Sequence, residues 1–106
     1  MDLTDLQNRL RSGQLDLRFT DHALVEARKD GLTAKDLEDA ATHGEMIEDY
    51  GVRALLLNVT EEDALPCHIV VEYDPTAGVE ATVVTAYLPE SKEWQKGWKR
   101  RKRGRR

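Results

Sequence analysis

The chain has 106 residues and a formal net charge of −4, and this length indicates one domain with a modest hydrophobic core. Its single cysteine, Cys67, excludes an internal disulfide bond, and its three histidines form no zinc-binding pattern, so we expect neither a metal nor a cofactor. No apolar run approaches the ~20 residues of a membrane span, and residues 1–10 are charged, unlike a signal peptide, so we expect a cytoplasmic protein without membrane contact.

Three helices are predicted in the first half of the chain. Each begins at a threonine whose side chain can accept a hydrogen bond from a free backbone amide, and each ends at a glycine. They lie between Thr4 and Gly13, between Thr20 and Gly31, and between Thr33 and Gly44. In the third helix, Leu37, Ala40 and Ala41 form an apolar stripe. Residues 15–19 alternate between apolar and polar, which indicates a short strand or extended segment.

After residue 44 the pattern changes to that of strands. Predicted strands cover residues 45–50, 52–59, 67–73 and 79–88. In the second of them, residues 52–59, apolar side chains occupy odd and even positions alike, as expected of a central strand that is covered on both faces. Short connections favour antiparallel neighbours. Helices followed by strands therefore predict an α+β domain, in which N-terminal helices pack on an antiparallel sheet of about four strands.

The end of the chain differs in composition from the rest. Residues 1–91 hold 7 basic and 19 acidic side chains, whereas residues 92–106 hold 9 basic and 1 acidic. We therefore predict one acidic domain over residues 1–91 and a basic tail over residues 92–106. The tail contains Trp94 and Trp98, four residues apart, so a short helix would place both on the body.

A cationic tail attracts phosphate backbones without reading their sequence, and salt weakens its hold. Nucleic acid is therefore the first partner that we consider, and RNA is one possibility. The alternative is a solubilising or disordered terminus that binds nucleic acid non-specifically. The residues expected to contact nucleic acid are Lys96, Lys99, Arg100, Arg101, Lys102 and Arg103.

Four short motifs occur in order along the chain and are followed by Trp94 and the basic segment. They are TDHA at residues 20–23, EMIEDY at 45–50, PCHIVV at 66–71 and TAYLP at 85–89. The set, within roughly residues 15–100, resembles a family of small prokaryotic proteins that contain a domain of unknown function. That family is itself similar to RelE-like toxins of the barnase–EndoU–colicin–RelE group.

The resemblance implies a RelE-like fold and a metal-independent ribonuclease-type toxin, similar to an mRNA interferase. Genes of this family often lie beside genes for zinc-finger proteins similar to the MqsA antitoxin, which implies such a protein as the partner in a toxin–antitoxin pair. RelE-like toxins tend to be basic over the catalytic sheet, whereas residues 1–91 here are acidic. An acidic body leaves room for a cationic partner.

Metal-free RNA cleavage needs a base for the 2′-hydroxyl proton, a cation for the developing charge and an acid for the leaving oxygen. Histidine suits both proton roles, because its reference pKa is about 6.5. His22 and His68 are the histidines within the motifs. His22 falls in the first turn of a predicted helix, where free amides favour an anion; alternatively, it only packs or caps the turn. We expect the two imidazoles to meet on one exposed surface.

Two further residues complete the predicted catalytic set. His68 should lie opposite residues 84–86 across a hairpin, and Tyr87 nearby would donate to a phosphate or stack on a base. The alternative is a structural histidine beside a tyrosine of the sheet face. Arg53 is best placed to meet a sheet-bound phosphate, unless it forms a surface ion pair. The predicted catalytic residues are His22, His68, Tyr87 and Arg53.

Two functions compete at this point. The first, which the resemblance favours, is a ribonuclease-type toxin whose activity a partner protein restrains, and it depends on the motifs, their two histidines and the basic tail. The second is a non-catalytic adaptor that binds a protein through the acidic body and nucleic acid through the basic tail. It depends on the division of charge alone.

Overall fold

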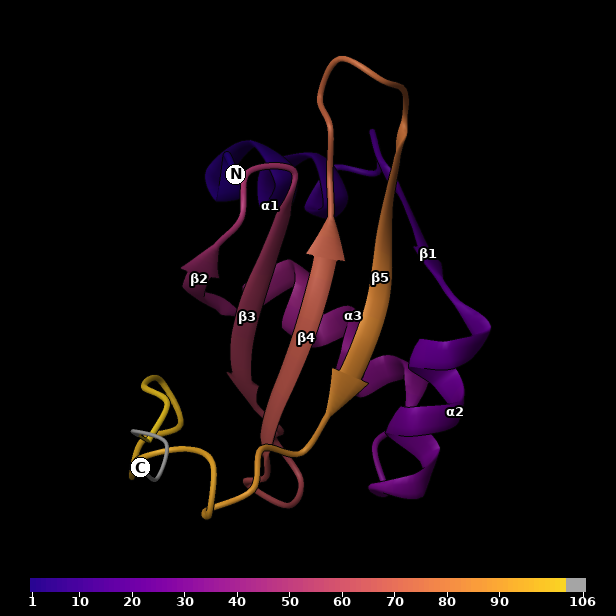
Figure 1. The fold of residues 1–106 in the computed structure, drawn as a ribbon. Coiled ribbons are helices and arrows are strands. Elements are labelled where there is room, and N and C mark those ends of the chain that lie inside the picture. The colour runs from indigo at the N-terminus through magenta and orange to yellow at the C-terminus, as the bar shows by residue number, and fades with distance from the viewer. Residues whose placement is uncertain (103–106) are drawn as a thin grey trace.

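The structure is a computed structural model that describes residues 1–102. Within these residues the chain forms three helices and five strands (Figure 1). The helices are α1 (Leu3–Arg11), α2 (Asp21–Lys29) and α3 (Ala34–His43). The strands are β1 (Asp16–Phe19), β2 (Glu45–Asp49), β3 (Arg53–Val59), β4 (Pro66–Glu72) and β5 (Glu80–Tyr87). None of the described helices is long and apolar enough to cross a membrane.

The five strands form one open sheet in the order β1-β5-β4-β3-β2. The pairs β2–β3, β3–β4 and β4–β5 are antiparallel, which confirms the predicted α+β class. The sheet has one strand more than the expected four, because β1 pairs with β5 in parallel, from Asp16 beside Glu80 to Phe19 beside Val83. The alternating pattern of residues 15–19 indicated this strand but not its partner.

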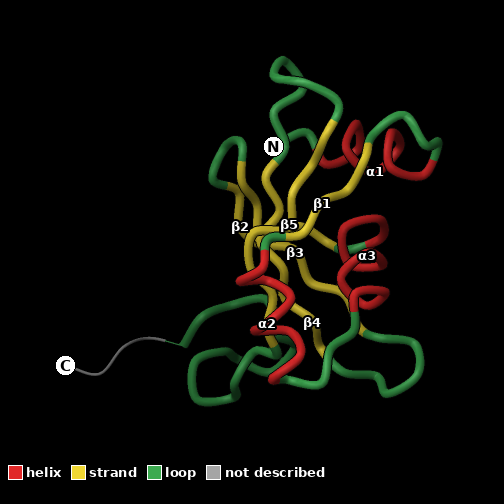
Figure 2. Tube along the Cα trace, turned by 90° about the vertical axis from the view of Figure 1, so that its right-hand side faces the viewer, coloured by secondary structure: helices red, strands yellow, loops and turns green. Residues whose placement is uncertain are grey.

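All three helices contribute to a core on one face of the sheet. Leu6, Ala23 and Leu37, one from each helix, are fully buried in the same apolar cluster as Leu56 and Ile69 of the sheet. The stripe predicted on α3 is confirmed, since Leu37, Ala40 and Ala41 are all inaccessible to solvent. Viewed edge-on, α1 and α3 lie on one side of the sheet and the C-terminal segment lies on the other (Figure 2).

Side-chain caps fix where the helices begin. The hydroxyl of Thr20 accepts from the amide of Ala23 at the start of α2, and Thr33 and Asp36 form a reciprocal capping box at the start of α3. The predicted cap of the first helix was wrong. Its N-cap is Asp2, whose carboxylate accepts from the amide of Asp5, and a carboxylate is a strong acceptor there because it also interacts favourably with the helix dipole.

Gly44 joins α3 to β2 at a point where no side chain fits. A Cβ at this position would lie 2.3 Å from the carbonyl oxygen of Ala40 and 3.2 Å from that of Leu57, and both are backbone atoms. We expect Gly44→Ala to lower the free energy of unfolding by about 2–3 kcal/mol, because the end of α3 must shift away from the sheet. Urea denaturation followed by circular dichroism measures this loss.

Gly13 provides the control for that substitution. Its φ of +77° is left-handed, but a Cβ there meets nothing within 4 Å. Gly13→Ala should therefore cost only the backbone strain, about 1 kcal/mol. Equal losses at the two positions would show that crowding at Gly44 does not matter.

Candidate functional site

The C-terminal segment folds back over the sheet face that the helices leave open. We call residues 90–102 the C-terminal strap. A turn at Glu90 leads to Trp94, and a bridge between Trp94 and Arg101 closes the loop. The short helix expected around Trp94 and Trp98 does not form, because Gly97 (φ +95°) and Trp98 (φ +66°) both adopt left-handed backbone conformations. The strap is therefore a closed loop that lies against the body.

Buried apolar side chains also lie on the sheet face opposite the helices. Leu55 and Leu57 alternate along β3 with Ala54 and Leu56, so they face away from the helices, yet they are only 1% and 8% exposed. Trp94 of the strap is also buried, at 3% exposure. This confirms that β3 is covered on both faces.

His68 is the centre of the polar part of this face. Its ring is fully buried and meets the Trp94 ring edge-to-face, with centroids 4.4 Å apart. Nε2 lies 2.8 Å from the carbonyl oxygen of Trp98, and Nδ1 lies 3.3 Å from the hydroxyl of Tyr87. A carbonyl can only accept, so Nε2 carries the proton and Nδ1 accepts from Tyr87. Both ring nitrogens are thus engaged within the protein.

Burial keeps both partners of this pair neutral. Removal from water disfavours the charged imidazolium and lowers the pKa of His68, although its hydrogen bond to the carbonyl of Trp98 opposes this shift. Burial likewise raises the pKa of the Tyr87 hydroxyl. A neutral imidazole that accepts from a neutral phenol is the arrangement of a satisfied structural pair. It becomes a proton-transfer site only if the strap moves away.

The register of β4 and β5 explains why this pair meets. The sequence placed His68 opposite residues 84–86, whereas the structure pairs it with Tyr87. A bulge between Val70 and Val71 shifts the register, so that Val71 pairs with Val83 but Val70 pairs with Thr85. The extra residue brings Tyr87, rather than a core-facing neighbour, beside the imidazole.

The strap is attached to the sheet edge by two ion pairs. Arg101 donates from Nε and Nη2 to the two carboxylate oxygens of Glu48, each at 3.0 Å, and its guanidinium lies 4.6 Å from the centre of the Trp94 ring. The Arg101 bond lowers the pKa of Glu48, which is therefore ionised, and the hydroxyl of Tyr50 donates to the same carboxylate. Nearby, Lys99 lies 3.1 Å from a carboxylate oxygen of Glu45.

The other predicted catalytic residues lie elsewhere. His22 is exposed in the first turn of α2, in the helix layer, and the structure records no contact between it and His68. Arg53 is also exposed, and it donates from Nε to Glu72 at 3.0 Å. Along β3 it is four residues from the partner of His68, or about 13 Å. The structure therefore brings His68 and Tyr87 together, but the expected surface with two imidazoles does not form.

The predicted nucleic-acid contacts divide into two groups. Lys96, Arg100 and Lys102 are exposed on the strap and form no ion pair within residues 1–102, whereas Lys99 and Arg101 bind glutamates of β2. Arg103 lies outside the described residues. Sequence reasoning missed the role of Glu45 and Glu48, which looked like a solvated edge. Strict alternation along β2 places Glu45 and Glu48 on opposite faces, and the register of β2 against β3 shifts between Met46 and Glu48, so the sequence offered only their charge, opposite to that of the tail.

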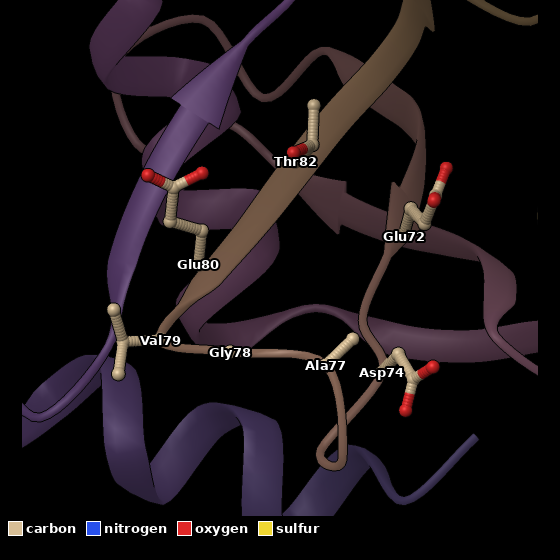
Figure 3. Close-up of a pocket in the computed structure, with 7 residues that line it drawn as sticks. All are labelled: Glu72, Asp74, Ala77, Gly78, Val79, Glu80 and Thr82. Carbon is tan, nitrogen blue, oxygen red and sulfur yellow. The ribbon is translucent and has the colours of Figure 1, made fainter.

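Two hollows lie on or beside this face, and both are acidic. A cavity of about 350 Å³ next to Tyr87 is lined by Trp94 and Arg101 and by the carboxylates of Glu26, Asp30, Glu90 and Glu93. A second, of about 400 Å³, lies at the β4–β5 loop, where Glu72 and Glu80 flank Thr82 (Figure 3). Carboxylates repel phosphates, so neither hollow suits an RNA backbone.

Other chemistry finds little support in the described residues. Within residues 1–102, no group of three or more His, Cys, Asp or Glu side chains is arranged to hold a metal ion. Cys67 is buried in the core, and burial raises the pKa of its thiol to about 12, which makes it unreactive.

Residues 19–88 match a family described as a domain of unknown function, DUF4258. The match extends from the end of β1 to just beyond β5, so it contains His22, His68 and Tyr87, while the C-terminal strap lies outside it. No curated protein and no solved structure matches the chain. The resemblance to a domain family of unknown function is thus confirmed, and the link to RelE-like toxins stays a prediction.

Proposed function

The chain belongs to the DUF4258 domain family, and we propose that it is a non-catalytic adaptor that binds nucleic acid through its basic tail and a cationic protein through its acidic body. One observation carries this proposal. The histidine that resembles a catalytic residue is buried with both nitrogens engaged, whereas Lys96, Arg100 and Lys102 are exposed. The strap cations can therefore reach a ligand at the surface, whereas the imidazole of His68 cannot exchange a proton with one.

The body holds few cations that could repel a cationic partner, and four of its seven basic side chains form ion pairs. Its cations are mostly neutralised by neighbours, as in the pairs of Arg18 with Glu80 and Arg53 with Glu72. Lys29 pairs in the same way with Glu26. The excess of carboxylates is therefore uncompensated over much of the surface, which favours basic segments. A zinc-finger protein similar to an antitoxin, the partner implied by the resemblance, is one protein of this kind to test.

A specific observation favours a second function, the ribonuclease-type toxin. His68 and Tyr87 come from two separate motifs and meet on the sheet, within reach of the ionised Glu48 and the guanidinium of Arg101. These groups are the acid, base and cation types that RNA cleavage requires. In this function the strap would have to open before RNA reached the imidazole.

The adaptor proposal is tested by neutralising the exposed cations in the full chain. We expect Lys96→Gln, Arg100→Gln and Lys102→Gln together to weaken binding of a labelled single-stranded oligouridylate at every salt concentration. The slope of log K against log salt should fall by about 2, because each phosphate contact on a single strand contributes roughly 0.7. Fluorescence anisotropy over a series of KCl concentrations provides the measurement.

The matched control removes three cations from the body. Arg18, Lys29 and Lys35 are held by Glu80, Glu26 and Asp39, so their replacement by glutamine should leave the salt slope unchanged. Equal effects of the two triple variants would refute a specific role of the tail. The same samples, run on a gel, report the second function: cleavage of RNA by the wild type that Tyr87→Phe abolishes would establish the toxin instead.

A further inference from the structure

Arg101 and Lys99 of the strap cannot bind glutamates of the body and a phosphate with the same donor atoms at the same time. Resting on the proposed nucleic-acid binding, we propose that Glu48 and Glu45 are intramolecular competitors of phosphate, and that nucleic acid binds the strap fully only by displacing Arg101 from Glu48 and Lys99 from Glu45. The two glutamates then set the affinity of the tail without touching the ligand.

The geometry of the Arg101 pair supports direct competition. The guanidinium presents one edge, Nε and Nη2, to both oxygens of Glu48. This fork also matches two oxygens of a phosphate, so the two anions require the same donors. Both glutamate pairs are reachable by solvent, since the Arg101 and Lys99 side chains are each 54% exposed. A phosphate can therefore approach before either pair opens.

The two ion pairs are weak enough for a phosphate to displace the glutamates. Exposed ion pairs contribute little to stability, and the bidentate pair on Trp94 contributes more than a single contact. The strap has other attachments, which are the buried Trp94 ring and the hydrogen bond from His68 to the carbonyl of Trp98. Loss of the two ion pairs therefore does not require the strap to unfold. Because binding and the ion pairs are linked, removing a glutamate must strengthen binding of the anion.

The test compares three glutamates whose replacement makes the same change of charge, two that pair with the strap and one that pairs with the body. We expect Glu48→Gln to bind the oligouridylate about three- to tenfold more tightly than the wild type, and Glu45→Gln to show a smaller gain, since its pair has a single contact. Glu80→Gln is the control, because it makes the same change of charge but pairs with Arg18 of β1. Anisotropy titrations at one fixed salt concentration give the affinities.

A second readout follows the strap itself. Both tryptophans of the chain, Trp94 and Trp98, lie in the strap, so their emission reports on it. Inorganic polyphosphate, which carries no bases to quench fluorescence, should change the emission of the wild type as Arg101 leaves the Trp94 ring. Glu48→Gln should reach the same end point at a lower polyphosphate concentration.

The outcomes separate this inference from the function on which it rests. If the wild type binds and Glu48→Gln gains no more than Glu80→Gln, competition is overturned and the adaptor function stands. If neither the wild type nor Glu48→Gln binds the oligouridylate, the proposed function fails and the inference fails with it. If Glu48→Gln gains more affinity than Glu80→Gln and its emission changes at a lower polyphosphate concentration than that of the wild type, both are supported.

Discussion

Replacing Trp94 by alanine should lower the free energy of unfolding by about 3–5 kcal/mol, the range observed for truncating a buried Trp or Phe. Trp94 is 3% exposed and supports two neighbours at once, the His68 ring at 4.4 Å and the Arg101 guanidinium at 4.6 Å. Its loss exposes the imidazole to water. Urea denaturation followed by circular dichroism measures the change without relying on tryptophan emission.

Trp98 is the matched control, because it is the same residue type in the same strap. Its ring is only partly buried, and it attaches to His68 through its backbone carbonyl, which an alanine also provides. We expect Trp98→Ala to cost about 1 kcal/mol or less. If Trp94→Ala were equally mild, the strap would be an appendage rather than part of the fold, and His68 would become accessible without a partner.

The main features of the fold could be predicted because they leave local traces. Leu37, Ala40 and Ala41 repeat with the helical period, and glycines mark where helices stop. Apolar residues at both odd and even positions of β3 correctly predicted that both of its faces are buried. The pairing of β1 with β5 could not be predicted, since Phe19 and Val83 lie far apart in the chain and no local pattern records which strand is the neighbour. Likewise, the bulge near Val70 that selects Tyr87 has no clear signature in the sequence.

The candidate site was predicted only in part, for a related reason. Periodicity placed His68 and Tyr87 on adjacent strands, and this contact is present. Resemblance grouped His22 with them by motif, but a motif records similarity of residues and not their position in space. The attachment of Arg101 to Glu48 joins residues 53 apart, and charge alone suggested that the tail was available to RNA. The structure shows instead that Arg101 and Lys99 of the tail are paired with glutamates of the body.

His68→Ala should lower the free energy of unfolding by about 3 kcal/mol, from a cavity and two lost hydrogen bonds. The Trp98 carbonyl and the Tyr87 hydroxyl would both lose their partner. We expect His68→Gln to recover part of this loss, because its amide can donate to the same carbonyl. Denaturant unfolding of the three proteins at pH 7.5 gives the comparison.

The pH dependence distinguishes a buried structural histidine from one that titrates at the surface. The folded-state pKa of His68 is lowered by burial, so above about 6.5, the unfolded value, both states are neutral and its contribution is complete. As the pH falls below 6.5, the unfolded state binds a proton that the folded state does not, and stability is lost down to the folded pKa. His68→Gln should lack this fall. If the wild type and His68→Gln lost stability in parallel between pH 6.5 and 5, the imidazole would be open to solvent. That result would favour the ribonuclease-type function, which requires an accessible His68.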